Sequence, residues 1–331
     1  MIQLFTIFGI LIFFSLSYAV TEEEAKAALK KEKQPEEVLT QFERDYILLK
    51  KSVLEIDTDI SYVYYSANQI FLESFAILDP VFLTLGKFDI ERFRRHILTY
   101  ALTFRYGITN NIELDVAVPV IYRFERKSIT NKPDETNNVL GLGDATISLS
   151  YQPVRETYKR PAIITFLAVK TKTGKSPYEL EDPKKDLPTG SGYYSIRAGF
   201  NLTKTIDPVV VFGGINYAYN MDVKVDKLVE GKFLQKVYPG DNIGINIGLA
   251  YALTYNFAIN YQLIQNYTLT TKTKIDGKVQ DAPNSTLNST VFRLGFGWIF
   301  SPNLSVNVGI SIGLTSDAPD YSFELRFPYK I

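Results

Sequence analysis

The sequence contains no cysteine and a single histidine among its 331 residues. Without cysteine the chain forms neither a disulfide framework nor a thiolate metal site. Lys and Arg number 36, as do Asp and Glu, so the formal charge is zero and no basic surface indicates nucleic acid. Beyond the N-terminal region no hydrophobic run reaches the ~20 residues of a spanning helix. The sequence therefore predicts no metal, no cofactor and no nucleic-acid partner, and it excludes a helical membrane protein.

Aromatic residues are abundant by contrast, with 22 Tyr and 22 Phe against one Trp and two Met. Such residues suit pleated, half-buried surfaces and predict an all-β fold. The final stretch, Tyr321 to Ile331, alternates strictly between apolar or aromatic residues and others that include Glu324, Arg326 and Lys330. Because most strands repeat this alternation, their apolar faces need an apolar solvent, the lipid bilayer. An open sheet would leave unpaired edge groups in lipid, so we predict a single transmembrane antiparallel β-barrel.

Segments with this alternation recur along the chain and predict about twelve strands. They cover residues 53–65, 98–106, 113–123, 143–151, 194–202, 209–221, 242–251, 257–263, 292–300, 304–314 and 321–331, and residues 162–171 add a strand whose two faces the sequence does not distinguish. A hairpin hidden in Ser66–Phe93, which lacks clean alternation, would raise the number to about fourteen. The connections from Ile108 onward mostly alternate between short and long, which places the short turns and both termini in the periplasm. Pro119 cannot donate to a ladder, so we expect a bulge or bend there.

The region before the strands falls into two parts. Residues 1–19 contain an apolar run that ends on small residues, and they predict a signal peptide that is cleaved on export. Residues 20–51 predict a short periplasmic helix from Pro35 to Lys51, which is either a spacer, a coiled-coil handle for homo-oligomers or a helix inside the lumen. Residues 52–331 then form the barrel. Export and lipid-facing strands together predict the bacterial outer membrane.

Charged residues occupy the inward side of the predicted strands. They are Asp57, Asp59, Arg105, Glu113, Asp115, Arg123, Asp144, Arg197, Arg293, Glu324 and Arg326. Charges that line a lumen can select permeants by charge or dipole. Alternatively, guanidinium groups and carboxylates pair across the lumen as structural braces, because an unpaired buried charge is costly. A barrel of ~12 strands leaves room for a narrow channel.

Two further features are candidates for function. The segment Ser66–Phe93 is apolar for an external loop, and we predict that it folds over or into the mouth, either as a lid or as an apolar entry for aromatic solutes. Its apolar residues are Phe71, Leu72, Phe75, Ile77 and Leu78. His96 has no nucleophile motif beside it, which disfavours catalysis. Its neighbours Arg94 and Arg95 favour a basic boundary that meets lipopolysaccharide phosphates.

Three stretches of the chain resemble a known family. They read GLGDATISLSY at Gly141–Tyr151, TGSGYYSIRAGFNLTKTIDPVVVFGGINYAYN at Thr189–Asn220, and VGISIGLTSDAPDYSFELRFP at Val308–Pro328. They are similar to the outer-membrane barrel family labelled "MetA-pathway of phenol degradation", which is transporter-like. The resemblance runs from about Leu54 to the end of the chain and implies a barrel that passes small, including aromatic, compounds. Such barrels usually finish on an aromatic residue for the assembly machinery, whereas this chain ends Tyr329-Lys330-Ile331.

The predicted function is passive passage of small solutes, aromatic or hydrophobic compounds among them, through an outer-membrane channel that is not an enzyme. One alternative is a structural barrel with a plugged lumen, and another is an outer-membrane lipid hydrolase that depends on His96. The predicted partners are outer-membrane lipid and lipopolysaccharide, the barrel assembly machinery and a small-molecule solute, with a homo-oligomer as a further state.

Overall fold

The computed structural model describes residues 46–68, 90–129, 133–180, 186–229 and 232–331. Thirteen strands form one antiparallel sheet, and twelve of these close into a ring because β2 pairs with both β1 and β3. The twelve are β1 (Leu54–Asn68), β2 (Ile90–Thr109), β3 (Ile112–Ile129), β5 (Thr146–Val154), β6 (Ala162–Lys170), β7 (Ser195–Ile206), β8 (Val209–Asn220), β11 (Asn242–Thr254), β12 (Phe257–Thr268), β15 (Leu287–Ile299), β16 (Ser305–Gly313) and β17 (Tyr321–Lys330). The predicted twelve-stranded barrel is confirmed.

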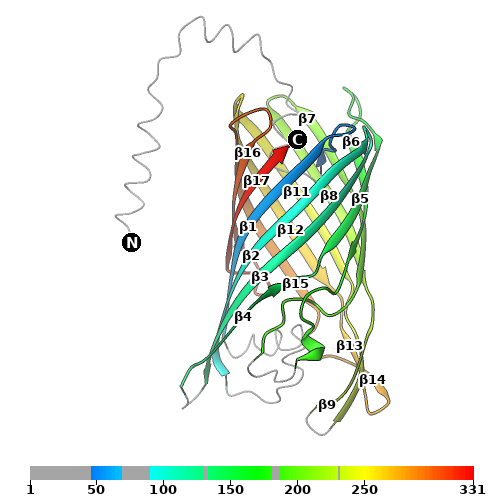
Figure 1. Ribbon diagram of the computed structural model, residues 1–331, viewed down its shortest axis with the longest axis vertical. Coiled ribbons are helices and arrows are strands. Elements are labelled where there is room, and N and C mark those ends of the chain that lie inside the picture. Colours follow the sequence, from blue (N-terminus) through cyan, green and yellow to red (C-terminus); the bar gives the residue numbers. More distant parts are fainter. Residues whose placement is uncertain (1–45, 69–89, 130–132, 181–185, 230–231) are drawn as a thin grey trace, which may run out of the picture. The chain divides into compact units, whose positions relative to one another are not determined.

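The last strand closes the barrel against the first. β17 pairs with β1 from Glu55 opposite Lys330 to Tyr64 opposite Tyr321, and the two strands lie side by side in Figure 1. β1 pairs along its other edge with β2 as far as Asn68 opposite Arg92. Because β1 pairs directly with β2 in the ring, the described barrel has twelve strands and the alternative of fourteen is wrong. β2 begins at Ile90, eight residues before the predicted start at Leu98.

Outward and inward positions alternate as the sequence predicted. In β11 the outward residues Ile245, Ile247 and Leu249 are exposed, whereas Gly244 and Ala250 on the inward side are buried. The same holds in β2, where Leu98, Tyr100 and Phe104 are among the exposed side chains and Thr103 and Arg105 are buried. An exposed apolar belt of this kind is stable in lipid and not in water. Among the described residues no helix is long and apolar enough to cross a membrane.

Inward glycines let polar side chains lie flat against the barrel wall. A Cβ atom on Gly295 would lie 2.2 Å from Oδ1 of Asn260, and one on Gly214 would lie 2.1 Å from Oδ1 of Asn201. In each pair the asparagine stands on the neighbouring strand and covers the glycine. Small inward residues thus leave the large polar side chains room beside the wall.

Pro119 lies at a one-residue bulge where the partner of β3 changes from β5 to β4. β3 pairs with β5 over Ile112–Ala117 and with β4 (Glu135–Leu142) beyond it, starting at Val120. The β2–β3 register is continuous at Pro119, but on the other edge of β3 the three residues 143–145 lie opposite Val118 and Pro119, so the expected bulge is present in the partner strand. The carbonyl oxygen of Pro119 accepts a hydrogen bond from the Gly143 N–H at 2.8 Å within this bulge.

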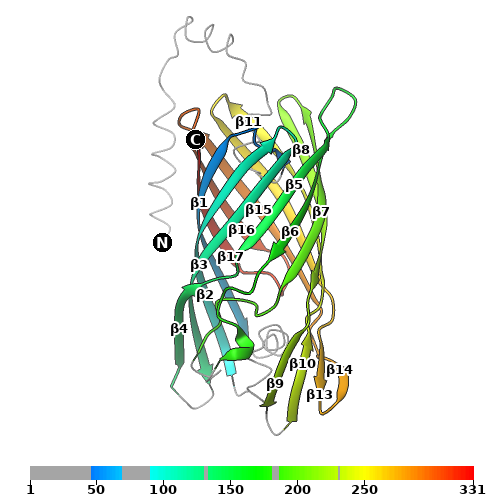
Figure 2. The ribbon, with the colours of Figure 1, turned by 45° about the vertical axis from the view of Figure 1, so that its right-hand side comes forward.

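Two connections predicted as long polar loops, residues 222–241 and 271–288, fold as hairpins instead. They contain β9 (Val223–Val229) with β10 (Lys232–Tyr238), and β13 (Lys272–Ile275) with β14 (Lys278–Asp281). The hairpins pair through β10 and β13 into a four-stranded sheet beyond one end of the barrel (Figure 2). The sequence signal was Asp276-Gly277, whose positive φ angles of 47° and 81° suit a two-residue hairpin turn.

The long and short connections separate to opposite ends of the barrel (Figure 1). The short turns, such as the one between β2 and β3, share one end with Lys330, while β4 and the four-stranded sheet lie at the other. Barrels of this type carry short turns on the periplasmic side, so the end with the hairpins is extracellular.

The signal peptide predicted for residues 1–19 lies outside the described residues. Most of the predicted periplasmic helix also lies there. Its final residues, Tyr46 to Lys51, are described and contain no α-helix.

We expect a charge on the outer face to destabilise the barrel strongly. Ile247, at the middle of β11, is 60% exposed, and Ile247→Arg would place a guanidinium group in the bilayer at a cost of about 2–4 kcal/mol. Val279→Arg is the matched control, since Val279 in β14 is 56% exposed but lies in the extracellular sheet. Denaturant unfolding in lipid vesicles measures both free energies. Equal stability of the two variants would contradict a lipid-facing β11.

Candidate functional site: the barrel lumen

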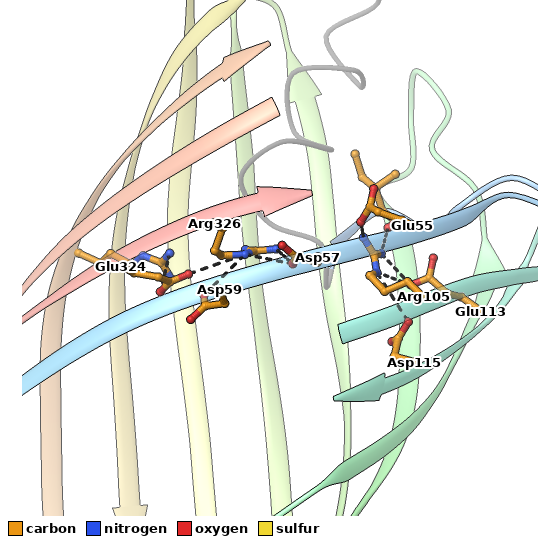
Figure 3. A network of polar contacts seen from close by, with 10 residues as sticks. Glu55, Asp57, Asp59, Arg105, Glu113, Asp115, Glu324 and Arg326 are labelled. Atoms are coloured by element: carbon orange, nitrogen blue, oxygen red, sulfur yellow. Dashed lines mark hydrogen bonds and ion pairs between the residues drawn. The ribbon is translucent and has the colours of Figure 1, made fainter. Parts of the chain in front are cut away.

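Arg105 forms the centre of a buried charge cluster at the periplasmic end of the lumen. Its guanidinium group is 2.6 Å from a carboxylate oxygen of Glu55, 2.7 Å from Glu113 and 3.6 Å from Asp115 (Figure 3). The Arg105 side chain is 4% exposed and those of Glu55 and Glu113 are 2% exposed. These charges come from β1, β2 and β3, where strict alternation directs them inward. The cluster braces three neighbouring strands.

A second cluster surrounds Arg326 on the neighbouring part of the wall. Its guanidinium group lies 2.7 Å from Asp57, and the carboxylates of Asp59 and Glu324 are within 4.0 Å (Figure 3). Glu324 also pairs with Arg293 of β15 at 3.1 Å. This chain of ion pairs joins β15, β17 and β1 across the seam where the barrel closes.

A third cluster lies toward the extracellular end and has the opposite charge balance. Glu125 of β3 accepts hydrogen bonds at 2.7 Å from Arg95 of β2 and from Arg123, and Lys127 stands 3.9 Å away. Glu125 and Lys127 were missed from sequence because the predicted strand ended at Arg123. Extending the alternation of β3 by two steps would have found both.

Among the described residues the three clusters differ in composition along the axis of the lumen. From mid-barrel to the periplasmic end, six carboxylates contact three guanidinium groups. Toward the extracellular end, Arg95, Arg123 and Lys127 surround the carboxylate of Glu125. Charged side chains therefore line both ends of the lumen, and the ion pairs that brace the wall also face its interior.

Arg197 differs from the other predicted lumen residues because it is exposed. It faces inward from β7, paired across the ladder with the buried Ala168 and Ala218. Its guanidinium carbon lies 5.8 Å from the ring centre of Phe166 in β6. β6 presents apolar side chains to the lumen, which are Ala162, Ile164, Phe166 and Ala168. Its outer face is also apolar, which is why the sequence could not assign the two faces of this strand.

Asp144 holds an extracellular connection in place. Its carboxylate accepts hydrogen bonds from the Gly174 N–H at 3.1 Å, and from the Ser191 N–H and hydroxyl at 2.7 and 2.6 Å. Lys170 adds an ion pair at 3.7 Å. Gly190 packs so closely that a Cβ atom there would lie 2.4 Å from the Asp144 carboxylate. This aspartate, the last residue of the GLGD stretch, thus binds both ends of the β6–β7 connection.

The described part of the β6–β7 connection is packed against the extracellular sheet and the barrel wall. Tyr178, in the 3₁₀ helix Pro177–Glu179, packs with Leu234 and Val237 of β10. Leu187 is buried, and the carbonyl oxygen of Pro188 accepts a hydrogen bond from Arg123 at 3.4 Å. The sequence did not predict that the β6–β7 connection packs at the extracellular end of the barrel. It predicted the lid in residues 66–93, and all five named lid residues lie outside the described residues.

Tyr193 shows how enclosed this connection is. Burial raises the pKa of Tyr193 to about 12, and the nearby Asp144 carboxylate adds to the effect. The Lys170 ammonium stands 4.3 Å from the centre of its ring. Tyr193 therefore keeps its proton at neutral pH and acts as packing beside the Asp144 contacts.

His96 lies among aromatic side chains on the outer face. Its Nδ1 is 2.8 Å from the Tyr62 hydroxyl, and its ring packs near Tyr64 and Phe124. This is the aromatic girdle expected where the barrel wall meets the lipid headgroups. Arg94 points outward beside it, whereas Arg95 points inward to Glu125. Among the described residues, no group of acidic and histidine side chains is arranged to hold a metal ion.

Comparison with known proteins identifies the family. A family model described as "Putative MetA-pathway of phenol degradation" matches residues 85–331. The chain belongs to this family. Its fold is similar to the crystal structure of the COG4313 outer membrane channel from Pseudomonas putida F1, with a TM-score of 0.62 and 14% identity over 87% of this chain and 98% of that chain. The family member described here is thus an outer-membrane β-barrel, as the sequence resemblance predicted.

Two further solved barrels match with lower scores. The translocator domain of the autotransporter NalP from Neisseria meningitidis has a TM-score of 0.48 and 9% identity over 92% of this chain and 97% of that chain. The toluene transporter TodX from P. putida has a TM-score of 0.39 and 9% identity over 85% of this chain and 90% of that chain.

Removing the Arg105 charge should destabilise the barrel. Arg105→Ala leaves the buried carboxylates of Glu55 and Glu113 without their guanidinium partner, a loss of about 3–5 kcal/mol of unfolding free energy. Arg126→Ala is the control, since the Arg126–Asp134 pair is exposed and its loss should leave stability nearly unchanged. Denaturant unfolding in vesicles measures both. Equal free energies of unfolding for the Arg105 and Arg126 variants would show that the Arg105 cluster does not stabilise the barrel.

Removing the Asp144 carboxylate should release the β6–β7 connection. Asp144→Ala deletes the acceptor for Gly174 and Ser191, so we expect faster proteolytic cleavage within residues 171–194 of the folded barrel. Asp186→Ala in the same connection is the control, because Asp186 makes one exposed pair with Lys175. Limited proteolysis followed by mass spectrometry compares the rates. Equal rates in the two variants would rule out Asp144 as the anchor.

Proposed function

We propose that this protein is an outer-membrane channel for the passive passage of small solutes that combine an aromatic or hydrophobic body with a polar or anionic group. The observation that carries the proposal is the inward face of β6 and β7, where the exposed Arg197 stands beside Phe166. An apolar strip suits an aromatic ring, and an accessible guanidinium group suits a phenolate or carboxylate. Family membership supports the proposal, because the family description concerns phenol degradation.

The polar lumen supports passage rather than chemistry. The charged side chains at the two ends are paired with one another, and His96 lies on the outer face away from them. Solutes that cross the barrel meet charged side chains near both ends of the lumen. Lipopolysaccharide, the assembly machinery and a homo-oligomer stay predicted partners, and the apolar lid in residues 66–93 stays a prediction.

A plugged structural barrel is the second candidate. The β6–β7 connection packs on the extracellular side, and the segment Tyr46–Leu49 contacts inward-facing side chains near the periplasmic end. A barrel that is permanently closed in this way predicts silent bilayers for the protein and for every variant.

Conductance across planar bilayers tests the channel. We expect an ion-selective conductance that simple phenols block, and a shift of the reversal potential toward cations in Arg197→Ala, because an accessible lumen cation is lost. Arg94→Ala is the matched control, since it removes the same charge from the outer face of β2. Identical reversal potentials in the two variants would exclude Arg197 as a selectivity determinant.

A further inference from the structure

The segment that precedes β1 enters the lumen at its periplasmic end. The Tyr46 side chain is buried, and its ring packs 4.7 Å from that of Phe212, centre to centre, with Val210 and Ala250 beside it. Its hydroxyl donates a hydrogen bond to Oδ1 of Asn246. All four partners face inward from β8 and β11, whose neighbouring positions face lipid. Tyr46 is therefore inside the barrel.

The other end of this segment is bound to the opposite wall. The Leu49 N–H donates a hydrogen bond to the Glu113 carboxylate at 2.5 Å, and the carbonyl oxygen of Ile47 accepts one from Arg105 at 3.3 Å. Leu49 is buried, whereas Lys50 beside it is exposed. These contacts join the segment to the buried Arg105 cluster of β1, β2 and β3.

The two walls are diametrically opposite. In the ring of twelve strands β11 stands six strands from β2 in either direction, through β1 and β17 or through β3 and β5. Three residue steps of extended chain reach about 10 Å, and the Tyr46 side chain extends the segment further. Tyr46–Leu49 thus crosses the lumen, and we call it the strap.

We propose that the strap is the constriction at the periplasmic end of the lumen, and that Tyr46 determines the size of the solutes that pass. The proposal rests on the channel function proposed above. Tyr46 is the residue of the strap that reaches the far wall, so its ring occupies space that a solute must cross.

The two ends of the strap make contacts of different kinds. At Leu49 and Ile47 the partners are a carboxylate and a guanidinium group, and hydrogen bonds to charged groups are roughly twice as strong as neutral ones. At Tyr46 the contacts include a hydrogen bond to Asn246 and apolar packing against Phe212. A substitution of Tyr46 therefore changes the contacts at one wall and leaves the charged partners of Leu49 and Ile47 in place.

Conductance of Tyr46 variants tests the constriction. Tyr46→Ala removes the ring, so we expect a several-fold higher conductance and, in liposome swelling, entry of larger solutes. Tyr46→Phe keeps the ring and loses the Asn246 contact, so its conductance should lie nearer to that of the parent protein. Tyr64→Ala is the control, because Tyr64 belongs to the outer girdle. Unchanged conductance in Tyr46→Ala, with a conducting parent protein, overturns the constriction and leaves the channel standing.

Thiol labelling tests the position of the strap without reference to conductance. Since the chain has no cysteine, Leu49→Cys and Lys50→Cys each introduce a single thiol. We expect a bulky maleimide to label Leu49→Cys several-fold more slowly than Lys50→Cys, and Tyr46→Ala to speed the labelling of Leu49→Cys. Equal rates would overturn the strap.

The combined results separate the two proposals. Silent bilayers for all variants, Tyr46→Ala included, would overturn the channel function and with it the size-determining role of Tyr46. Slow labelling of Leu49→Cys in that case would still place the strap inside a structural barrel. A parent protein that is silent and a Tyr46→Ala variant that conducts would show that Tyr46 closes the lumen, and would overturn its role in selecting solutes by size.

Discussion

The closed ladder of backbone hydrogen bonds is the constraint on which the rest of this structure depends. In lipid no water satisfies an unpaired N–H or C=O group, so an open sheet edge is too costly. Pairing of β17 with β1 removes the last two edges. Closure then forces every strand to present one face to lipid and the other to the lumen. The exposed apolar residues outside and the buried charges inside are two consequences of the same ring.

Charge pairing follows from this closure. Inward side chains of β1, β2, β3 and β17 are crowded together, so a guanidinium group placed among carboxylates is stabilised and a lone charge would not be. Arg105 and Arg326 each contact several carboxylates, whereas Glu125 contacts several cations. The structural brace and the electrostatic field of the lumen are therefore the same set of residues. Arg197, exposed beside Phe166, stands apart from this network and is accessible to a solute.

At each end of the lumen, charged side chains of the barrel wall bind a segment of the chain that lies outside the twelve strands. Asp144 and Arg123 bind the β6–β7 connection on the extracellular side. Glu113 and Arg105 bind the segment Tyr46–Leu49 on the periplasmic side. In the proposed channel a solute passes between the charged wall and the chain segments that this wall holds.

The sequence by itself predicted the barrel, about twelve strands and the inward side of charged residues such as Arg105, Glu113 and Arg326, because a strand alternates with a period of two and lipid accepts one kind of face. It did not predict the hairpins beyond the membrane or the start of β2 at Ile90, since strands in water need no apolar outer face. Which charges pair depends on the register between neighbouring strands, and the alternation of apolar and polar residues along one strand does not determine this register. The tertiary structure alone decided that Asp144 binds a loop and that Tyr46 meets Phe212 across the lumen, because these residues are far apart in sequence and come together through the ring.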